Sequence, residues 1–282
     1  MTARKGNHMA RLTGYALDLF QLAKRYRWDP AAINLTVDQR DWAALDAREQ
    51  DVLLNLLSLF VAGEEAVASD LAPLLWAVGK LGGRREEEMY LTTQLYDESL
   101  HVEFFSRWFG EVVRRPVDHD RYYGPSYRAV FFERLPRALD GLLADRSPRA
   151  LAQAYLTYHI VVEGVLAETG YQAAFLACRR RGVLPGLVEG FENVKRDESR
   201  HVAYGLYALQ RLIQAEPALW AFCNDTLNEL LGHALGVIPE ALAPYGDEIP
   251  FGISLAEMTD YALDQFNKRY MVLERAVAGE TD

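Results

Sequence analysis

Cysteine is almost absent from this 282-residue chain, which has only Cys178 and Cys223. Two cysteines so far apart form neither a disulfide framework nor a cysteine-rich zinc site, so we expect two buried thiols in a reducing compartment. The N-terminal residues lack the apolar run of a signal peptide, which favours a cytoplasmic protein. No stretch reaches the roughly 18 uncharged apolar residues that a membrane span requires, so we expect no transmembrane segment.

Positive charge is also scarce, because 30 lysines and arginines face 40 aspartates and glutamates and leave a formal net charge of -10. Nucleic acids are bound by basic surfaces, so we expect no nucleic-acid partner. Hydrophobic residues make up 50% of the chain and charged residues 25%, which is the composition of a globular protein with a substantial core.

Alternation of apolar and polar residues, the pattern of strands, is nearly absent, whereas apolar residues recur at helical spacing along most of the chain. The sequence therefore predicts an all-α fold, with residues 1–282 forming a single domain. Asp46 with Glu49 forms a capping box, Ser147-Pro148 is a second start signal, and Gly182 is a stop signal. The predicted core helices span about 46–81, 86–114, 148–181 and 185–214, and further helices are expected at about 127–143, 217–236 and 254–275.

A duplicated motif contains most of the candidate metal ligands. Residues 97–101 and 197–201 are two copies of Asp-Glu-Ser-x-His. Each copy puts a carboxylate and an imidazole three residues apart, on one face of a helix. Each is preceded by a helix with a glutamate inside an apolar stretch. This order of glutamates and Glu-x-x-His pairs is the ligand set of di-iron and di-manganese carboxylate bundles. The predicted metal ligands are Glu64, Glu98, His101, Glu163, Glu198 and His201.

Charge balance supports the same interpretation. Four carboxylates among apolar neighbours would be very costly unless cations neutralise them, and two divalent ions supply four positive charges. Oxidation of both metals to the trivalent state adds two positive charges, which a small bound anion would balance. Oxygen and nitrogen ligands without thiolate suit iron and manganese better than copper(I) or a structural zinc.

The first ligand is ambiguous in sequence, because Glu64 and Glu65 are adjacent. We choose Glu64, which shares its helix face with the stronger apolar stripe. The remaining histidines lie outside the pattern and are expected at the surface or as satisfied core residues: His8, His119, His159 and His233.

Over about residues 25–275 the sequence resembles the ribonucleotide reductase small-subunit superfamily, whose core is a ferritin-like four-helix bundle with additional helices. Trp28-Asp29-Pro30 and Arg196-Asp197-Glu198 strengthen the match. The resemblance implies a hydrogen-bonded chain of Trp28, Asp197 and His101, although plain core packing of Trp28 remains an alternative. A partner such as Asp197 is what a metal-bound imidazole normally requires.

Several short segments resemble the ligand-binding oxidase branch of that superfamily. They are Gly63-Glu64-Glu65-Ala66-Val67, Glu88-Met89-Tyr90-Leu91-Thr92, Thr157-Tyr158, Val162-Glu163-Gly164 and Thr169-Gly170-Tyr171, the last of which places Tyr171 beside the ligands. One departure is that members of the branch read Tyr-Asn-His, whereas here the histidine of Tyr158-His159 is shifted by one position.

The branch implies a particular chemistry. Its members assemble a manganese/iron cofactor, with two irons as the alternative, activate dioxygen, bind a long-chain fatty acid at the metals and form a valine–tyrosine ether cross-link. Here manganese would lie in the Glu64 half of the site and iron in the Glu163 half, and the cross-link would join Val67 Cβ to the Tyr158 phenolic oxygen. On an ideal helix Tyr158 and Glu163 point roughly 140° apart, so a π-bulge is needed to bring both to the metals. A homodimer is also expected.

Two other functions remain open at this stage. A manganese/iron radical-generating small subunit of ribonucleotide reductase would have the same ligands. Phe105 stands where classical small subunits carry a radical tyrosine, but manganese/iron subunits also lack that tyrosine. The stronger reason to favour the oxidase is that the sequence ends shortly after Arg275 without the tyrosine tail that relays the radical. A ferritin-like storage protein would need higher-order shells and many metal ions, whereas we expect two metals per chain.

Overall fold

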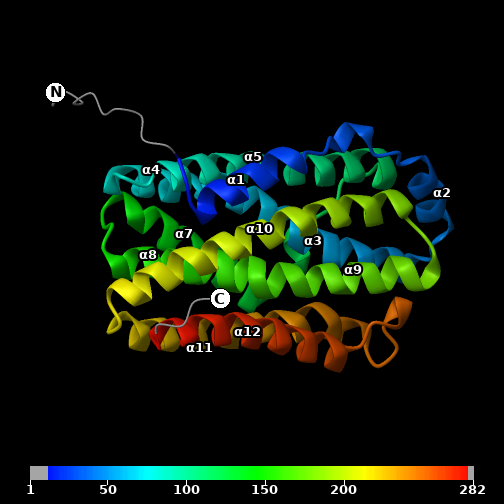
Figure 1. Cartoon of the computed structure of the whole chain (residues 1–282). Coiled ribbons are helices and arrows are strands. Elements are labelled where there is room, and N and C mark those ends of the chain that lie inside the picture. The colour runs from blue at the N-terminus through cyan, green and yellow to red at the C-terminus, as the bar shows by residue number, and fades with distance from the viewer. Residues whose placement is uncertain (1–11, 279–282) are drawn as a thin grey trace.

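The structure is a computed structural model that describes residues 12–278, with the side chains of residues 65–69 excepted. Within that range every regular element is a helix and no strand occurs, which confirms the predicted all-α fold. The main helices run side by side along the long axis of the molecule (Figure 1).

Four long helical segments form the core. They are α3 (Ala47–Asp70), α5 (Arg85–Trp108) with its π-helical continuation η2 (Phe109–Val113), the continuous segment α8 (Pro148–Tyr155), η6 (Leu156–Ala167) and α9 (Glu168–Arg181), and α10 (Pro185–Ala215). α3 packs on α5, and α10 packs on both η6 and α9. Three of the four predicted core ranges agree with these bounds to within a few residues.

The predicted helix 46–81 is wrong in one respect, because it is two helices, α3 and α4 (Ala72–Leu81), separated at Leu71. Pro73 lies in the first turn of α4. Proline has no backbone N–H, and its ring clashes with the carbonyl four residues earlier, so a helix cannot continue unbroken through it but can begin there.

The predicted start and stop signals act as expected. The amide of Glu49 donates to Asp46 Oδ1 at 2.8 Å and the amide of Asp46 donates to Glu49 Oε2 at 3.1 Å, which is a complete capping box. Ser147 Oγ accepts from the Ala150 amide at 3.2 Å and Pro148 follows in the first turn. Gly182 ends α9 at a φ of 65°, a left-handed conformation that favours glycine.

Further helices cover this core. The predicted ranges missed two N-terminal helices. α1 (Tyr15–Arg25) packs on α5 and α10, and α2 (Thr36–Ala44) packs on η2 and α10. α11 (Leu219–Leu242) and α12 (Leu255–Val277) lie together along the other side and pack on η6 (Figure 1). Short elements complete the chain: η1 (Pro30–Ala32), η3 (Asp120–Tyr122), α6 (Pro125–Arg128), the π-helical η4 (Ala129–Arg134), α7 (Leu135–Asp140), η5 (Gly141–Leu143), η7 (Ala243–Tyr245) and η8 (Pro250–Gly252).

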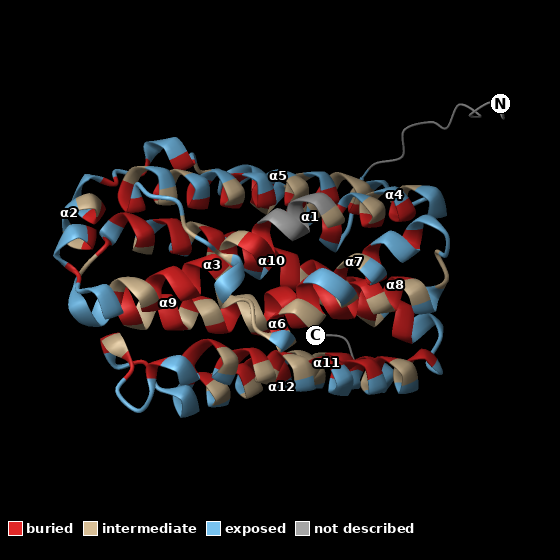
Figure 2. Cartoon of the chain, turned by 180° about the vertical axis from the view of Figure 1, so that it is seen from behind, coloured by how far each residue is buried: buried red, intermediate tan, exposed pale blue. Residues whose placement is uncertain are grey.

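The continuous segment Pro148–Arg181 is largely buried. Every residue from Leu156 to Val165 is buried, and Figure 2 shows the buried surface concentrated on the inner faces of the long helices. By length and composition alone, this segment is the one helix among the described residues that could cross a membrane, which is weak evidence for a span. Because 78% of its most apolar window is buried inside the protein, it has the character of a central core helix.

Candidate metal centre

All six predicted ligands converge at the centre of the bundle. Glu64 comes from α3, Glu98 and His101 from α5, Glu163 from η6, and Glu198 and His201 from α10, and none of the six is more than 5% exposed. Their ligand atoms form two overlapping groups within which all atoms lie within 4.8 Å of one another. One group is Glu64, Glu98, His101 and Glu198, and the other is Glu98, Glu163, Glu198 and His201.

Glu98 and Glu198 belong to both groups and lie between the two histidines. Glu98 directs Oε2 to His101 Nδ1 at 3.2 Å and Oε1 to His201 Nδ1 at 3.1 Å. Glu198 directs Oε1 to His101 Nδ1 at 3.5 Å and Oε2 to His201 Nδ1 at 3.4 Å. Each of these carboxylates therefore offers one oxygen to each side, which is how a carboxylate bridges two cations.

Glu64 and Glu163 each belong to one side only. Glu64 Oε2 lies 3.3 Å from His101 Nδ1, and Glu163 Oε1 lies 3.3 Å from His201 Nδ1. The Glu64 carboxylate thus faces the cluster, as the stronger apolar stripe predicted. The side chain of the alternative, Glu65, lies outside the described residues.

Electrostatics shows why this cluster needs cations. Burial raises the pKa of Glu64 and of Glu198 to about 7, and burial together with the Glu198 charge raises the pKa of Glu163 well above its usual range. Burial acts in the same direction on Glu98, but the adjacent histidines His201 and His101 outweigh it and hold its pKa well below the usual range. Without metals the cluster therefore retains protons that two divalent ions could replace.

The donor set fits such ions. Among the described residues, Oε2 of Glu98, Glu163 and Glu198 and Nδ1 of His201 are buried without a hydrogen bond of good geometry. Buried polar atoms are almost always satisfied, so four such atoms within this one cluster of side chains indicate a missing ligand. Carboxylate oxygen and imidazole nitrogen are the donors that iron and manganese accept.

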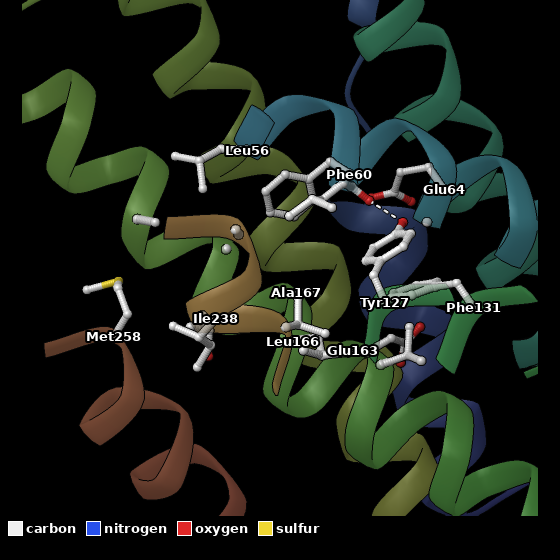
Figure 3. Close-up of a pocket in the computed structure, with 18 of the residues that line it drawn as sticks. Leu56, Phe60, Glu64, Tyr127, Phe131, Glu163, Leu166, Ala167, Ile238 and Met258 are labelled. Carbon is white, nitrogen blue, oxygen red and sulfur yellow. Dashed lines mark hydrogen bonds between the residues drawn. The ribbon is translucent and has the colours of Figure 1, made fainter. Parts of the chain in front are cut away.

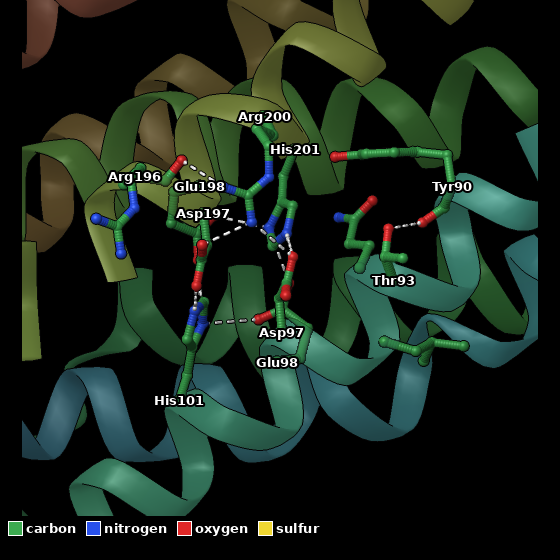
Figure 4. Close-up of polar contacts among 12 residues, drawn as sticks. Tyr90, Thr93, Asp97, Glu98, His101, Arg196, Asp197, Glu198, Arg200 and His201 are labelled. Atoms are coloured by element: carbon green, nitrogen blue, oxygen red, sulfur yellow. Dashed lines mark hydrogen bonds and ion pairs between the residues drawn. The ribbon is translucent and has the colours of Figure 1, made fainter. Parts of the chain in front are cut away.

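The predicted chain from Trp28 to the site is present. Trp28 Nε1 donates to Asp197 Oδ2 at 2.7 Å. The same oxygen lies 3.4 Å from His101 Nε2, a contact that Figure 4 shows. Asp197 therefore orients His101 so that Nδ1 faces the carboxylates. The Trp28 ring also packs against Phe104, with 6.0 Å between ring centroids, so core packing and the hydrogen-bonded chain coexist.

Asp97 plays the same part for the second histidine and was missed by the sequence reasoning. Asp97 Oδ2 lies 3.4 Å from His201 Nε2, as Asp197 does from His101. Arg200 joins the two, donating from one nitrogen to Asp97 Oδ2 at 2.9 Å and Asp197 Oδ1 at 2.6 Å (Figure 4). The duplicated motif was a sufficient signal for Asp97, because both copies begin with aspartate.

The segment that carries Tyr158 is π-helical, as the sequence argument required. Hydrogen bonds from residue i to i+5 bring residues five apart onto one side, so Tyr158 and Glu163 both face the cluster. Tyr158 donates its phenolic proton to Glu98 Oε1 at 2.7 Å. Val67, the predicted cross-link partner, lies in α3 one turn after Glu64, but its side chain falls outside the described residues.

Gln94 is a second residue that the sequence did not reveal. It lies one turn before Glu98 on α5, and its Nε2 donates to Tyr158 Oη at 3.3 Å and to Glu163 Oε1 at 3.2 Å. The same amide lies 3.3 Å from His159 Nε2, so His159 is a buried core residue beside the site. Helical spacing from Glu98 was the only signal for Gln94.

Tyr171 and Phe105 lie in an aromatic layer next to the ligands. The Tyr171 ring stacks on Phe60, with centroids 5.1 Å apart, and Phe60 stacks in turn on Phe105 at 5.7 Å. Burial and then the charges of Glu198 and Glu64 raise the pKa of Tyr171 well above its usual range, so this phenol stays protonated near the carboxylates.

An apolar cavity of about 110 Å³ extends from the cluster between α3, the η6–α9 segment, α11 and α12. Glu64, Glu163 and Glu198 lie at its polar end. The Tyr127 hydroxyl donates to the Leu59 carbonyl at 2.6 Å, which leaves the ring as an apolar wall. Figure 3 shows the remaining walls, which include Leu56, Phe60, Phe131, Leu166, Ile238 and Met258.

These features together define a carboxylate-bridged, two-metal type of helical bundle, and comparison with known proteins agrees. The family model for the ribonucleotide reductase small chain matches residues 14–276. An R2-like ligand-binding oxidase with an aerobically reconstituted Mn/Fe cofactor is 33% identical, with a TM-score of 0.88 over 92% of each chain. Single-residue variants of an R2-like ligand-binding oxidase, reconstituted with Mn/Fe aerobically or anaerobically, are 34% identical, with a TM-score of 0.86 over 92% of this chain and 93% of theirs.

The chain therefore belongs to the ribonucleotide reductase small-chain family, in the branch of the R2-like ligand-binding oxidases. The predicted family, the ferritin-like architecture and the oxidoreductase class are confirmed by these matches.

Proposed function

We propose that Glu64, Glu98, His101, Glu163, Glu198 and His201 hold a manganese and an iron ion, or two irons, and that the protein uses them as a dioxygen-activating oxidase. The observation that carries this proposal is the bridging arrangement of Glu98 and Glu198, each with one oxygen toward each histidine. The Mn/Fe cofactor of the similar oxidases supports the choice of metals. By the same resemblance, manganese occupies the Glu64 half and iron the Glu163 half.

When bound, the two metals would supply the redox chemistry that reduces dioxygen. The protein's own contribution is to fix the ligands and to exclude water. Asp197 and Asp97 orient the two imidazoles, and Arg200 holds both aspartates in place. The buried π-helical segment closes the site on the side of Glu163, since all its residues from Leu156 to Val165 are buried.

The second element of the proposal is an ether cross-link between Val67 Cβ and the Tyr158 phenolic oxygen. The Val67 Cβ–H bond and the Tyr158 O–H bond break, one C–O bond forms, and two electrons and two protons leave, with dioxygen as the oxidant. Tyr158 is held for this step, because its oxygen donates to Glu98 and accepts from Gln94. Glu98 Oε1 accepts the phenolic hydrogen bond at 2.7 Å and so orients the Tyr158 oxygen.

The third element is a long-chain fatty acid as the bound ligand. Its carboxylate would meet the two extra positive charges of the trivalent metals at the end of the cavity where Glu64, Glu163 and Glu198 lie. Its alkyl chain would lie along the apolar walls formed by side chains such as Phe60, Ile238 and Met258. Burial of methylene groups in such a cavity stabilises the complex by about 0.8 kcal/mol each.

The experiment that tests the proposal is anaerobic loading of the full chain with manganese(II) and iron(II), followed by exposure to oxygen and peptide mass spectrometry. We expect the Val67 and Tyr158 peptides to be joined with the loss of two hydrogens. The Tyr158→Phe variant is the matched control, since it keeps the ring and the ligands but has no phenolic oxygen to link.

If the metals of the wild-type protein are fully oxidised but the Val67 and Tyr158 peptides are not joined, the cross-link is contradicted. The proposed dimetal site is not affected by that result. Extraction of the loaded protein with organic solvent tests the fatty acid independently. Homodimer formation and a cytoplasmic location stay predictions.

A further inference from the structure

Three tyrosines form a buried cluster on the His201 side of the site. Tyr90, Tyr155 and Tyr204 are each no more than 1% exposed. The Tyr90 and Tyr204 ring centroids are 4.6 Å apart, and those of Tyr155 and Tyr204 are 6.0 Å apart. We call these three residues the tyrosine cluster. Its members come from α5, α8 and α10, so it is a product of packing rather than of one sequence motif.

The cluster approaches the metal centre at two places. At one of them, Figure 4 shows the Tyr90 hydroxyl directed toward His201. The second contact runs through His159, whose ring lies 4.5 Å from that of Tyr158 and 5.9 Å from that of Tyr204. Aromatic rings therefore touch continuously from the ligand shell to Tyr204.

The cluster also reaches the surface. Tyr204 donates to Glu87 Oε2 at 3.4 Å, and Glu87 pairs with Arg211. Arg211 donates to the Tyr207 hydroxyl at 3.2 Å, and the Tyr207 ring lies 5.3 Å from that of Tyr15. Tyr15 is 45% exposed. The path thus ends at α1, where a partner or a small reductant can approach.

The Tyr155 and Tyr204 hydroxyls lie 3.3 Å apart and can hydrogen-bond to each other, but packing alone does not explain the Tyr90 hydroxyl. Burying a hydroxyl without a good partner costs free energy, and phenylalanine would fill the same space without that cost. The Tyr90 hydroxyl has no hydrogen-bond partner within the part of the chain that is described. Phe104, Phe105 and Phe191 show that the bundle uses phenylalanine at equally buried positions elsewhere.

We propose that the tyrosine cluster, with Tyr207 and Tyr15, is a route for single electrons between the surface and the His201 half of the metal centre, and that Tyr204 is its reversibly oxidised member. This proposal rests on the proposed function, because the oxygen-oxidised metal centre is the oxidant.

The step balances as follows. Tyr204 gives one electron, by way of Tyr90, to the oxidised centre, which is reduced by one unit, and its phenolic proton passes to Glu87 Oε2. The resulting tyrosyl radical takes one electron from a one-electron reductant at the Tyr15 surface, such as a thiolate or a reduced redox protein, and recovers the proton from Glu87. Glu87 suits this exchange, since its carboxylate is held next to the phenol by Arg211 and Arg84.

The first test uses the loaded full-length protein. Chain containing ring-deuterated tyrosine is loaded with manganese(II) and iron(II), exposed to oxygen without added reductant, freeze-quenched and measured by electron paramagnetic resonance. We expect a tyrosyl signal that is narrowed by the deuterium and that is lost in Tyr204→Phe. Tyr96→Phe is the matched control, because Tyr96 is 49% exposed and lies outside the cluster, and it should keep the signal.

Full oxidation of the metals without a tyrosyl signal, or an equal signal in Tyr204→Phe, would overturn the proposal. Metals that stay divalent in oxygen would instead contradict the proposed function, and a second test then decides the inference. The metal-free full chain is flash-oxidised with photogenerated tris(bipyridine)ruthenium(III), which attacks exposed tyrosines.

We expect the oxidation to pass from the exposed tyrosines to Tyr204 and to give a persistent tyrosyl signal there. Its loss in Tyr204→Phe, its faster decay in Glu87→Gln and its retention in Tyr96→Phe would support the route. A persistent signal of the same size in Tyr204→Phe, or an equal loss in Tyr96→Phe, would overturn it. Circular dichroism and thermal melting of each variant show that the fold is retained.

Discussion

The two halves of the metal centre carry the same Glu-x-x-His motif but have different surroundings. The His101 half is built on regular α-helices, α3 and α5, and its outer partner is the Asp197–Trp28 chain. The His201 half draws on the π-helical segment η6 and on α10, and its neighbours are Asp97, Gln94 and the tyrosine cluster. The motif thus supplies equivalent candidate ligands to both halves, whereas the side chains around them differ.

The largest difference is expected between a substitution of a ligand that both halves share and a substitution of a ligand that belongs to one half. Glu98→Gln leaves one oxygen donor where two are needed, so we expect both metals to bind far more weakly. The loss should exceed the roughly 10–100-fold that follows from removing an outer hydrogen-bond partner. Glu64→Gln should weaken metal binding only in the Glu64 half. Elemental analysis after gel filtration measures both, and equal losses in the two variants would contradict the bridging role of Glu98.

The next largest effect concerns the outer aspartates. Asp197→Asn and Asp97→Asn remove the charge that orients His101 and His201 respectively, and each should lower metal affinity about 10–100-fold in its own half. Competitive titration with a chelator, with manganese and iron followed separately, measures the two affinities. A variant that weakens the opposite half more than its own would show that Arg200, which links both aspartates, dominates instead.

The pH dependence of the metal-free protein follows from the raised pKa values. Glu64 and Glu198 have a pKa of about 7 in the fold and an ordinary value of 4.5, so between these values the folded chain binds more protons than the unfolded one. Its free energy of unfolding should therefore fall as pH rises from about 5 to 7, by up to about 1.4 kcal/mol per pH unit for each group.

Thermal melting across this range checks the prediction. The metal-loaded protein should show little of the fall, because metals have replaced the protons, and Glu64→Gln should show less of it than wild type. A melting temperature of the metal-free chain that rises with pH over this range would contradict the account.

The smallest effect is expected at Gln94. Gln94→Leu removes hydrogen bonds to Glu163 and Tyr158, and bonds to charged groups are worth about 1.5–3 kcal/mol. We expect a modest loss of stability, a lower linked fraction of Tyr158 and intact metal binding. Gln94→Glu is the comparison variant, since it keeps the size but adds a negative charge beside Glu163. Denaturant unfolding and peptide mass spectrometry measure the two effects.

Much of this architecture could be predicted from the sequence, because it depends on the spacing of residues within single helices. The capping box of Asp46 and Glu49, the Ser147-Pro148 start and the helix-face argument for Glu64 all rest on spacing within one helix. The need for a π-helical segment also followed from spacing, since Tyr158 and Glu163 are five residues apart.

The features that were missed have different causes. The break before Pro73 was visible locally and was overlooked in favour of the apolar periodicity. Asp97 was visible by analogy with Asp197. Gln94 and the tyrosine cluster could not be predicted, because their roles depend on which residues of α5, η6, α8 and α10 meet across the bundle.

The most direct test of the central claim is anomalous X-ray diffraction from crystals of the Mn/Fe-loaded protein, measured at the manganese and iron absorption edges. We predict two peaks, both contacted by Glu98 and Glu198, with the manganese peak beside Glu64 and His101 and the iron peak beside Glu163 and His201. A single peak, or metal bound away from these six side chains, would contradict the account.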